Sequence, residues 1–453
     1  MTEKVVSLLK PLQARFGGRL IFETDRFPDY ARDASEITVK PPAIIFADTE
    51  EEVIEIINFC RDRKIPIVFR GAGTGYTGGA VPVKNGLVLS LEHLKKLKII
   101  PEKRIGYCGP GVITIDLMKA AEKHRLFYPP DPASYDESTL GGNVAECAGG
   151  LHCKKYGVTK DYVIGLRAVT AEGELLKTGI YADNELFDII GVLIGSEGLL
   201  AAVTEIAVRL IELPEKGATI LAAFDDSENA ARVVSEVTRR GIVPAVMEYM
   251  DGDSAACSNQ YEKALELEKT EAILLFETTG IDSDTQTDDI MAICRKHRST
   301  ILKRETDEEK AEALWKIRRN LSKAVKASAE QKISEDVAVP PSRLPELVAF
   351  VAQLDAEYPV RINAYGHAGD GNLHVNFLVE AGKPDYSKEI EEGIKRLFNK
   401  TLALGGTLTG EHGIGLTKRE FLSWEFDAPT LGAMKAIKEV FDPQELLNPG
   451  KMF

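Results

Sequence analysis

The alternation of hydrophobic and polar positions in the first half of the chain predicts short strands that alternate with helices. Apolar side chains recur at helical spacing over residues 53–60, directly after the capping-box sequence T-x-x-E at Thr49 to Glu52. The apolar runs 65–69 and 87–91 are typical of buried strands, and residues 112–125 of an amphipathic helix. This half of the chain is therefore expected to form a mixed domain of sheets and helices.

The pattern changes after Leu213. Beyond this residue single strands and helices alternate, in the order strand 220–224, helix 227–240, strand 243–250, helix 254–269, strand 272–277 and helix 287–297. This order predicts a ferredoxin-like α+β unit with an antiparallel sheet. Helices at 314–326 and 343–357 and a hairpin at 361–379 complete the unit.

These changes of pattern divide the chain into four segments. They are an N-terminal helical segment (1–36), a glycine-rich domain (37–214), a second domain that carries a candidate metal site (215–420), and a C-terminal segment that packs back onto the first domain (421–453). The length of 453 residues agrees with two or three domains at roughly 150 residues each.

The net charge of the chain excludes one class of binding partner. The chain carries 56 Lys and Arg against 70 Asp and Glu, a net charge of −14. A general nucleic-acid binder is excluded, because it needs a basic stripe to neutralise phosphates. A small anionic substrate is not excluded, since one or two local cations suffice. No apolar run reaches about 18 residues and the first residues lack signal-peptide features, so we expect a cytoplasmic protein that does not cross a membrane.

The six cysteines are scattered, without the C-x-x-C pairs that bind zinc or iron–sulfur clusters. Free buried thiols are the expected state in a reducing cytoplasm. Cys147 and Cys153 are the closest pair, and the sequence leaves open whether they have a redox role or only pack.

Residues 70–79, RGAGTGYTGG, contain the pattern G-x-G-x-x-G after a predicted strand. A Rossmann dinucleotide site needs a helix to open at this loop, but the chain continues with a proline, an Asn-Gly turn and a strand. Consecutive glycines still allow backbone N–H groups to converge on an anion, and Arg70 adds a charge. A structural turn is the alternative, but two further glycine-rich loops, at 138–150 and 194–198, favour a long phosphate-bearing ligand.

The motifs RGAGTGYTGG, YPPDP, STLGGNVA, AGGLHCKKYG and IGSEGLL resemble the FAD-binding domain of the vanillyl-alcohol-oxidase superfamily. Within it they resemble the group of glycolate oxidase, D-lactate dehydrogenase and D-2-hydroxyglutarate dehydrogenase. The resemblance implies a PCMH-type FAD-binding domain of two subdomains, a ferredoxin-like cap, and C-terminal helices that return to the FAD domain. The histidine that binds flavin covalently in some relatives is not evident, so we expect non-covalent FAD.

The resemblance also implies which residues contact FAD: the pyrophosphate loop, the diphosphate and flavin segments, the closing turn and a C-terminal asparagine. They are Arg70, Gly71, Ala72, Gly73, Thr74, Gly75, Gly78, Gly79, Pro130, Asp131, Pro132, Ser138, Thr139, Gly141, Gly142, Asn143, Ala145, Gly149, Tyr156, Gly195, Glu197, Gly198 and Asn448.

Three of the seven histidines lie between 367 and 412. A turn at 368–371 would pair residue 365 with residue 374, so His367 and His374 would lie diagonally on one face of a hairpin, about 7–8 Å apart. Asn376 continues this polar face, while Val375 and Phe377 face the core. Glu411 and His412 are adjacent and flanked by glycines, and adjacent side chains tend to point apart.

His367, His374 and Glu411 form a set of two histidines and one carboxylate, which suits a divalent cation with open positions. Ordinary hydrogen-bonded histidines are the alternative for each residue taken alone. The resemblance supports the metal set, because the motifs G-H-x-G-D-G-N-x-H and E-H-G-x-G bind the metal in that family. Zinc, manganese and iron remain open.

The group implied by the resemblance oxidises 2-hydroxy acids, D-lactate or glycolate being the expected substrates. A metal that holds the hydroxyl and carboxylate oxygens would lower the pKa of the alcohol, His412 would take its proton, and hydride would pass to flavin N5. Arg318 resembles the family's substrate arginine, and Asn376 is expected to bind the same substrate. Lys332 is a weaker candidate because its stretch does not align cleanly.

Several alternatives remain open. D-2-hydroxyglutarate would need a second cation, a non-haem iron oxygenase would lack flavin, and an electron carrier would not react with hydroxy acids. Because the chain has no haem or iron–sulfur ligands of its own, the acceptor is expected to be an iron–sulfur subunit, an electron-transferring flavoprotein, a quinone or a cytochrome. Such a partner could hold the protein at the membrane periphery, and a homodimer is left open.

Overall fold

A computed structural model describes residues 2–35, 37–183, 189–262 and 270–453 of the chain. The chain forms two compact units. The first unit contains Met1–Gly149, Val158–Leu213 and Glu411–Phe453, and the second contains Gly150–Gly157 and Pro214–Gly410. Residues 411–420, expected in the second domain, thus belong to the first unit, and residues 150–157, expected in the first, belong to the second.

The first unit begins with a four-stranded sheet in the order β1 (Leu20–Ile21), β2 (Ala43–Phe46), β4 (Leu87–Ser90), β3 (Ile67–Arg70). The strands β2, β4 and β3 are parallel, and β1 pairs with β2 in the antiparallel sense. The strands β3 and β4 match the two apolar runs of the sequence. Three helices accompany this sheet: α1 (Thr2–Leu9), α2 (Gln13–Phe16) and α3 (Glu50–Arg63).

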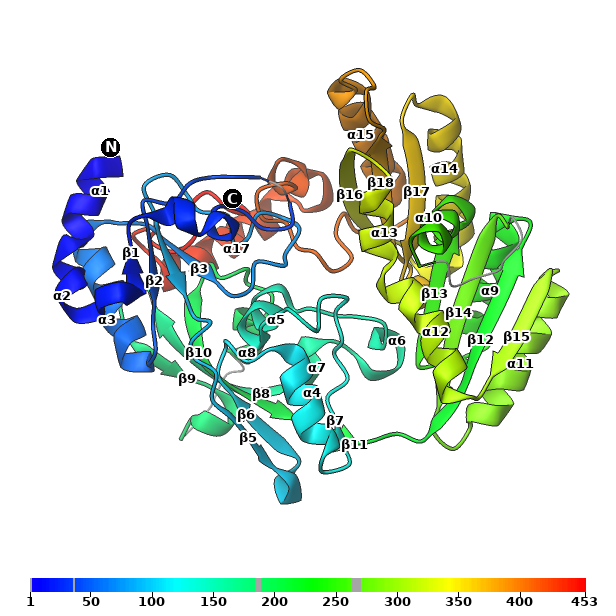
Figure 1. Ribbon diagram of the computed structural model, residues 1–453, viewed down its shortest axis with the longest axis horizontal. Coiled ribbons are helices and arrows are strands. Elements are labelled where there is room, and N and C mark those ends of the chain that lie inside the picture. The colour runs from blue at the N-terminus through cyan, green and yellow to red at the C-terminus, as the bar shows by residue number, and fades with distance from the viewer. Residues whose placement is uncertain (1, 36, 184–188, 263–269) are drawn as a thin grey trace. The chain divides into compact units, whose positions relative to one another are not determined.

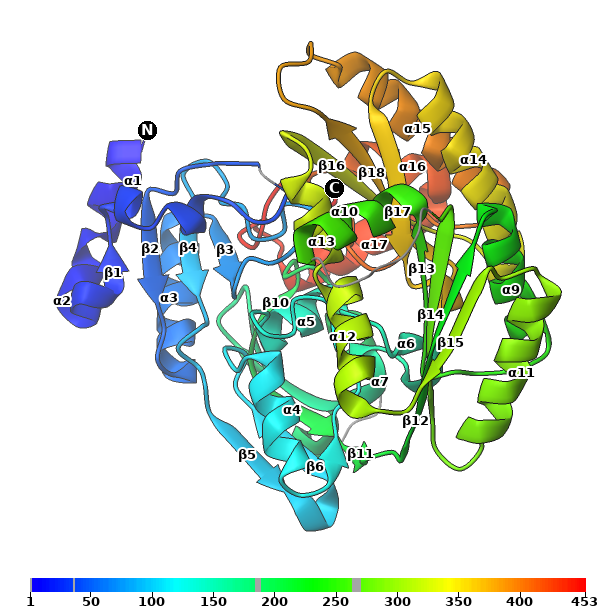
Figure 2. The same ribbon diagram turned by 45° about the vertical axis from the view of Figure 1, so that its right-hand side comes forward.

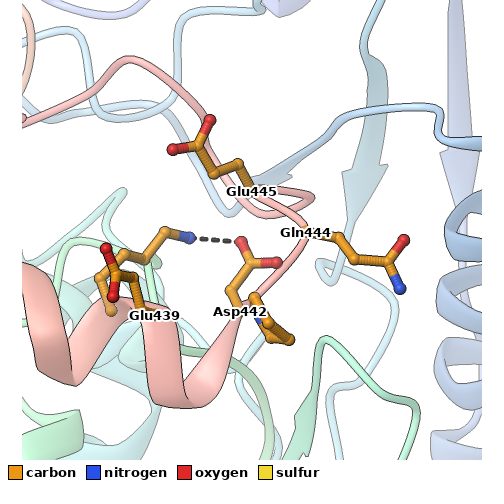
Figure 3. A pocket seen from close by; sticks show the side chains of 6 residues that line it. Glu439, Asp442, Gln444 and Glu445 are labelled. Carbon is orange, nitrogen blue, oxygen red and sulfur yellow. Dashed lines mark hydrogen bonds and ion pairs between the residues drawn. The ribbon is translucent and has the colours of Figure 1, made fainter.

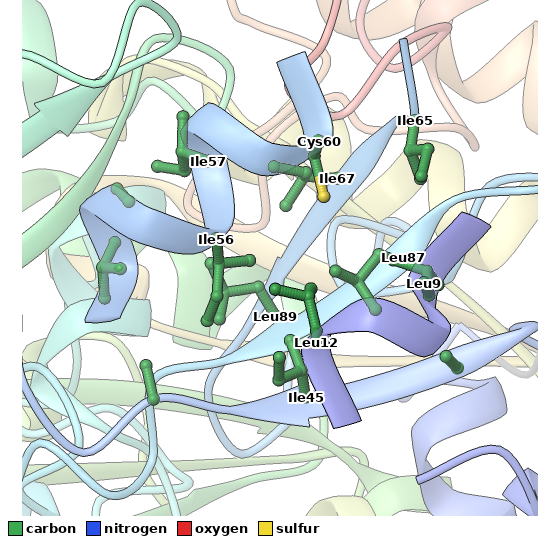
Figure 4. Packing of buried hydrophobic residues seen from close by; sticks show 14 of the residues in the cluster. Leu9, Leu12, Ile45, Ile56, Ile57, Cys60, Ile65, Ile67, Leu87 and Leu89 are labelled. Atoms are coloured by element: carbon green, nitrogen blue, oxygen red, sulfur yellow. The ribbon is translucent and has the colours of Figure 1, made fainter. Parts of the chain in front are cut away.

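The core of this subdomain explains why the N-terminal segment is part of the unit. Leu9 and Leu12 pack with Ile45 of β2, Ile56 of α3 and Leu89 of β4 in one buried cluster (Figure 4). None of these side chains is more than 4% exposed. The segment that the pattern set apart as residues 1–36 therefore contributes to the core of the first unit through its described residues.

The second subdomain of this unit is a five-stranded antiparallel sheet in the order β5 (Leu97–Ile100), β6 (Ile105–Cys108), β10 (Ala201–Arg209), β8 (Val163–Thr170), β9 (Leu175–Lys177). A short ladder joins β7 (Leu126–Phe127) to β11 (Ile211–Glu212). The helices of this part are α4 (Thr114–Glu122), α5 (Leu140–Glu146), α7 (Thr159–Tyr162) and α8 (Ile190–Leu193) (Figure 1).

The C-terminal segment returns to this unit through α16 (Leu422–Glu425) and α17 (Ala428–Phe441). After α17 in the chain, Leu447 forms a parallel bridge with Ile67 and packs in the same buried cluster as Leu9 and Leu12. The Asp442 carboxylate accepts hydrogen bonds from the N–H groups of Leu446 and Leu447. It also forms an ion pair with Lys438 (Figure 3), whose Nζ donates to the carbonyl oxygens of Leu199 and Leu447. Lys438 and Asp442, which line the pocket at this turn, therefore fasten the chain.

The second unit contains one antiparallel sheet of seven strands, in the order β15 (Ile301–Glu305), β12 (Lys216–Phe224), β14 (Ala272–Thr279), β13 (Val246–Asp251), β17 (Arg361–Gly366), β18 (Asn372–Val379), β16 (Gln331–Ala338). Numbered along the chain, the first four strands have the order 4-1-3-2 of a ferredoxin-like unit. The hairpin and β16 extend this sheet rather than forming a separate layer.

Helices cover both faces of the large sheet (Figure 2). One face carries α9 (Ser227–Arg239), α11 (Ser283–Lys296), α14 (Leu344–Glu357) and α15 (Ser387–Ala403). The other carries α10 (Gly252–Glu262), α12 (Glu308–Arg319) and α13 (Leu321–Ala327), while the short α6 (Cys153–Tyr156) comes from the inserted segment. The predicted helix 314–326 is thus two helices that meet at Asn320, and residues 263–269 of the predicted helix 254–269 lie outside the described residues.

No helix in the described part of the chain is long and apolar enough to span a membrane, as the sequence predicted.

The predicted capping box at the start of α3 forms only in part. Thr49 Oγ1 accepts the N–H of Glu52 at 3.2 Å. The carboxylate of Glu52, however, accepts the N–H of Asp48 at 2.8 Å and two hydrogen bonds from Arg19. The hydrogen bonds from Arg19, helped by that from Asp48, lower the pKa of the Glu52 carboxyl to about 2. Glu52 thus ties the N-terminal segment to α3.

We predict that Glu52→Gln lowers the free energy of unfolding by about 1–2 kcal/mol at neutral pH, because the buried charge-assisted hydrogen bonds are lost. The folded pKa lies below the ordinary value of 4.5, so this stabilisation is complete above that pH and is lost as the pH falls toward 2. Urea unfolding at pH 7 and at pH 3 measures the difference. Glu51→Gln, on the exposed side of α3, is the control, and an equal loss at both pH values would contradict the assignment.

Candidate active site

The glycine-rich loop follows β3 in the first unit, and the next regular element is β4, a strand parallel to β3. No helix opens at the loop, which agrees with the departure from a Rossmann finger seen in the sequence. Gly73 and Gly78 have φ values of 74° and 84°, and residues 71–76 keep part of their surface exposed. A Cβ added at Gly75 would meet no atom within 4 Å, so the loop leaves open space for a ligand.

Arg70, the last residue of β3, forms hydrogen bonds to the backbone. Its guanidinium is buried and donates to the carbonyl oxygens of Arg32 and Asp29, both at 2.8 Å. Its charged group lies 4.9 Å from the centre of the Tyr30 ring. Arg70 therefore holds residues 29–32 against the end of β3.

The second loop leads into α5. Thr139 caps the helix by accepting the N–H of Gly142 at 3.3 Å, and Gly71 lies so close that an added Cβ would be 2.1 Å from Thr139 Oγ1. The buried side chains of Ser138 and Asn143 both bond to Thr114, at 3.0 and 2.8 Å. The side chains of Ser138 and Asn143 thus hold the shape of the second loop. The backbones at Gly71 and Gly142 both lie close to Thr139, so the first and second loops meet there.

The third loop, Gly195 to Gly198, is held against α5 and the C-terminal segment. The N–H groups of Gly195 and Glu197 donate to Val144 and Ala145, and Asn448 Nδ2 donates to Gly198 at 2.9 Å. The predicted cofactor residues of this part therefore meet in the first unit. Gly141, Gly149 and the partly exposed Pro132 and Asp131 lie in the same unit.

Tyr156 is the exception among them. It belongs to the second unit, where its hydroxyl hydrogen-bonds Thr279 Oγ1 at 2.7 Å. Lys155 Nζ donates to the carbonyl of the same Thr279 at 2.6 Å. This contact fastens the inserted segment to the end of β14, a role that the glycine-rich motif did not suggest.

The histidine pair lies at the β17–β18 hairpin of the second unit. Tyr365 pairs with His374, as the turn predicted. The rings of His367 and His374 are 5.6 Å apart and perpendicular, and their ring nitrogens lie within 4.8 Å of each other. Both side chains are less than 10% exposed. Phe377 points to the opposite face, against Gly393 of α15.

Each of these histidines has a buried carboxylate beside its Nδ1. Glu248 Oε1 lies 2.8 Å from Nδ1 of His367, and Asp336 Oδ1 lies 3.6 Å from Nδ1 of His374. Glu248 and Asp336 are both fully buried. Metal-binding histidines commonly direct one ring nitrogen to a carboxylate and the other to the ion. The donor set of this hairpin therefore fits a divalent cation.

Two cations flank the same hairpin. The charged group of Arg318, on α12, lies 5.3 Å from the centre of the Tyr365 ring, and Nζ of Lys332, on β16, lies 5.7 Å from it. Arg318 is only 4% exposed and donates from Nε to Glu248 at 2.6 Å. Lys332 donates to Ser322 and to the Tyr365 hydroxyl. Two positively charged side chains thus lie beside the hairpin in the second unit.

Asn376 lies fully buried on the same face of β18 as His374. Its Nδ2 donates to Asn363 at 2.9 Å. Its Oδ1 has no hydrogen-bond partner among the described residues. A buried amide oxygen without a partner is costly, so this atom is suited to accept a hydrogen bond from a ligand.

Glu411 and His412 lie where the chain passes from the second unit back into the first. Gly410 is the last residue of the second unit, and an added Cβ would meet Asn372 Nδ2 at 1.8 Å and Asp336 Oδ1 at 3.0 Å. Glu411 follows directly on this residue. In the first unit, the His412 ring stacks on Tyr76 with 4.7 Å between centres, and its carbonyl accepts a hydrogen bond from Thr77.

Glu197 holds the chain just beyond His412. Its carboxylate accepts the N–H groups of Ile414 and Gly415, both at 2.7 Å. Burial nevertheless raises the pKa of Glu197, and burial together with the charge of Glu197 raises the pKa of Glu146. Burial also lowers the pKa of Lys451, which donates to Gly79, to about 7. The side chain of Glu197, expected to contact FAD, is thus used to fix the turn.

Sequence reasoning missed Glu248 and Asp336. Both lie on strands, Glu248 within a largely apolar stretch and Asp336 next to Glu335 in a largely polar one, so the local sequence provided no common signal. Glu248 interrupts the apolar stretch of β13, and its partners are 119 and 70 residues away along the chain. Only the pairing of the strands brings them together.

Comparison with known proteins agrees with this arrangement. Residues 41–179 match the FAD binding domain, and residues 213–452 match the C-terminal domain of FAD linked oxidases. The glycolate oxidase subunit GlcD of Bacillus subtilis (strain 168) is 38% identical over 96% of this chain and 92% of its own length. A D-lactate dehydrogenase of Anaerostipes hadrus is 32% identical over 94% and 92% of the two chains.

A solved structure shows the same fold. The p-cresol methylhydroxylase with substrate bound superposes with a TM-score of 0.80 and 16% identity, covering 99% of this chain and 96% of that one. The predicted fold class, a PCMH-type FAD-binding domain with an antiparallel-sheet cap, is confirmed. This chain therefore belongs to the FAD-linked oxidases of the vanillyl-alcohol-oxidase superfamily and is a flavoprotein oxidoreductase.

Proposed function

We propose that this protein oxidises a small D-2-hydroxy acid, D-lactate or glycolate, to the 2-oxo acid. The observation that carries the proposal is the buried guanidinium of Arg318 next to a buried histidine pair on the cap sheet. In this proposal the guanidinium binds the substrate carboxylate, and the histidine pair binds a divalent cation. The two relatives named for glycolate oxidation and D-lactate dehydrogenation support this substrate class.

Arg318 and Asn376 hold the substrate in this proposal. Glu248 occupies Nε of Arg318, so the two Nη groups form the edge that grips a planar carboxylate with two parallel hydrogen bonds. Asn376 Oδ1 accepts a hydrogen bond from the substrate at a buried position. These contacts orient the hydroxyl-bearing carbon.

His367, His374 and Glu411 would hold the divalent cation, and the glycine-rich loops of the first unit would hold non-covalent FAD. The cation supplies Lewis acidity that lowers the pKa of the substrate hydroxyl, and FAD supplies the hydride acceptor. Zinc, manganese and iron all suit two histidines and a carboxylate.

His412 accepts the hydroxyl proton. An imidazole is the side chain whose ordinary pKa suits proton transfer near neutral pH. Stacking on Tyr76 and the hydrogen bond from Thr77 to the backbone limit the motion of His412, and Glu197 fixes the next residues. The base is thus held by the chain on both sides.

A second candidate substrate is D-2-hydroxyglutarate. Lys332 lies by the same Tyr365 ring as Arg318 and offers a second cation for a distal carboxylate. A non-flavin oxygenase is less well supported, because the chain carries an FAD binding domain.

The reduced flavin needs an electron acceptor, and we propose a separate one: an iron–sulfur subunit, an electron-transferring flavoprotein, a quinone or a cytochrome. The name of the Bacillus relative, a subunit of an oxidase, supports a partner protein. We place the enzyme in the cytoplasm, with membrane association only through that partner.

The first test is a substrate panel. The purified protein is mixed anaerobically with D-lactate, L-lactate, glycolate or D-2-hydroxyglutarate, and the loss of oxidised-flavin absorbance is followed. We expect D-lactate or glycolate to bleach the flavin fastest, since one carboxylate matches one buried arginine. Fastest bleaching by D-2-hydroxyglutarate would select the second candidate, and a flavin that no hydroxy acid bleaches would refute the proposed function.

The second test concerns the base. We predict that His412→Ala slows anaerobic flavin reduction by about 10²–10⁴-fold, the usual contribution of a general base. His93→Ala is the matched control, because His93 is a half-exposed histidine of the same unit that pairs with Asp48. Flavin reduction at the wild-type rate in His412→Ala would remove His412 from the mechanism.

The third test concerns the carboxylate. We predict that Arg318→Lys raises KM by about 10- to 100-fold, because an ammonium cannot both reach Glu248 and form two parallel hydrogen bonds to a carboxylate. Arg319→Lys is the neighbouring control, since Arg319 is paired with Glu312 at the helix surface. Steady-state kinetics measure both variants, and equal KM values in the two would contradict the assignment.

A further inference from the structure

We infer that Glu248 is a positioning residue that serves a metal-binding histidine and the substrate arginine at the same time. The inference rests on the proposed function, because it assigns His367 to the metal and Arg318 to the substrate. It adds to that function a single carboxylate on which both binding groups depend.

The geometry of Glu248 is that of a bridge. The residue lies in the middle of β13, is 0% exposed, and shares the sheet face of Val246 and Met250, which pack in the core beneath α12 and α13. Its Oε1 lies 2.8 Å from Nδ1 of His367, and its Oε2 accepts the Nε–H of Arg318 at 2.6 Å. Each oxygen thus has its own partner.

The first consequence concerns the tautomer of His367. A carboxylate that is paired with a buried guanidinium can only accept hydrogen bonds, so Nδ1 of His367 must carry a hydrogen. The lone pair of the neutral ring is then on Nε2, the nitrogen that would bind a cation. Glu248 therefore keeps the ring both in the ligating tautomer and in a fixed orientation.

The second consequence concerns the orientation of Arg318. The hydrogen bond from Nε fixes the plane of the guanidinium, and the ring of Tyr365 covers one side of it at 5.3 Å. The Nη groups are thus presented along one edge. Since the same carboxylate holds His367, displacement of either partner is transmitted to the other.

Asp336, the carboxylate beside the other histidine, is arranged differently. It lies 3.6 Å from Nδ1 of His374 and accepts hydrogen bonds from Asn372 at 2.5 Å and from Thr409 at 3.1 Å. Its hydrogen bonds run to the hairpin and to residues before Gly410. Asp336 thus supports only a metal-binding histidine, whereas Glu248 supports both a metal-binding histidine and the substrate arginine.

The variant Glu248→Gln separates these roles, because an amide has only one accepting oxygen. The buried charge of Arg318 should take that oxygen, which turns the amide NH2 toward Nδ1 of His367. Nδ1 must then accept, and the ring hydrogen moves to Nε2, where it blocks metal binding. The size and shape of the side chain are unchanged.

The measurement uses the full-length protein with its FAD, stripped by a chelator and titrated with Co²⁺, whose visible absorption reports binding. We expect Glu248→Gln to bind Co²⁺ about 10- to 100-fold more weakly than wild type, the usual cost of losing such a supporting carboxylate. With Co²⁺ at saturation, KM for the hydroxy acid should stay raised by about tenfold, because Arg318 has lost its charged partner.

The matched control is Glu236→Gln. Glu236 is also a buried carboxylate of the second unit, bonded to a histidine ring nitrogen (His297 Nε2, 2.7 Å) and to the cation of Lys296. Within the described part of the chain its side-chain partners are Arg240, Lys296 and His297, which are outside the proposed site. We expect this variant to lose stability but to keep the wild-type Co²⁺ affinity and KM, which separates a positioning role from a purely structural one.

The outcomes are distinct. If Glu248→Gln binds Co²⁺ as wild type does, or weakens no more than Glu236→Gln, the inference is overturned. If the wild-type protein binds no Co²⁺, the inference is overturned as well. If Glu248→Gln weakens Co²⁺ binding but no hydroxy acid reduces the wild-type flavin, the metal role of Glu248 stands and the proposed function fails.

Discussion

The pairing of β17 with β18 is the constraint on which the chemistry of the second unit depends. Tyr365 lies opposite His374 in this ladder, and the turn between the strands places His367 on the same face. Because side chains alternate along a strand, a slip by one residue would move His374 and Asn376 into the core beneath α15. Gly371 makes the tight turn possible: its φ is 77°, and a Cβ there would lie 1.8 Å from the Val339 carbonyl.

The buried charges of two arginines are the second constraint, and both have partners close by. Arg318 faces Glu248, and Arg70 is surrounded by backbone carbonyls. Leaving either guanidinium without such partners would cost several kcal/mol, since burial of an unpaired charge is strongly unfavourable. The net charge of −14 therefore says little about the binding sites, where a few buried cations sit among neutral and acidic groups.

How much of the site could be foreseen depended on the range of the interactions. The pairing of Tyr365 with His374 was predictable, because a tight turn determines the register of the strands that flank it. The departure of the glycine loop from a Rossmann finger was also visible, because the proline and Asn-Gly turn lie within a few residues of it. The hydrogen bonds of Arg70 were not predictable, because residue type alone does not show that a guanidinium binds the carbonyl oxygens of Asp29 and Arg32.

The sequence by itself determined the local elements, the ferredoxin-like order of the second unit, the glycine-rich loops and the family to which they point. These features depend on periodicity, turns and motifs, all of which act over short stretches of chain. Only the tertiary structure decided that Glu248 joins His367 to Arg318 and that Glu197 holds the turn after His412. Those contacts join residues 70 to 217 positions apart, and the packing of strands and loops determines which buried acid meets which partner.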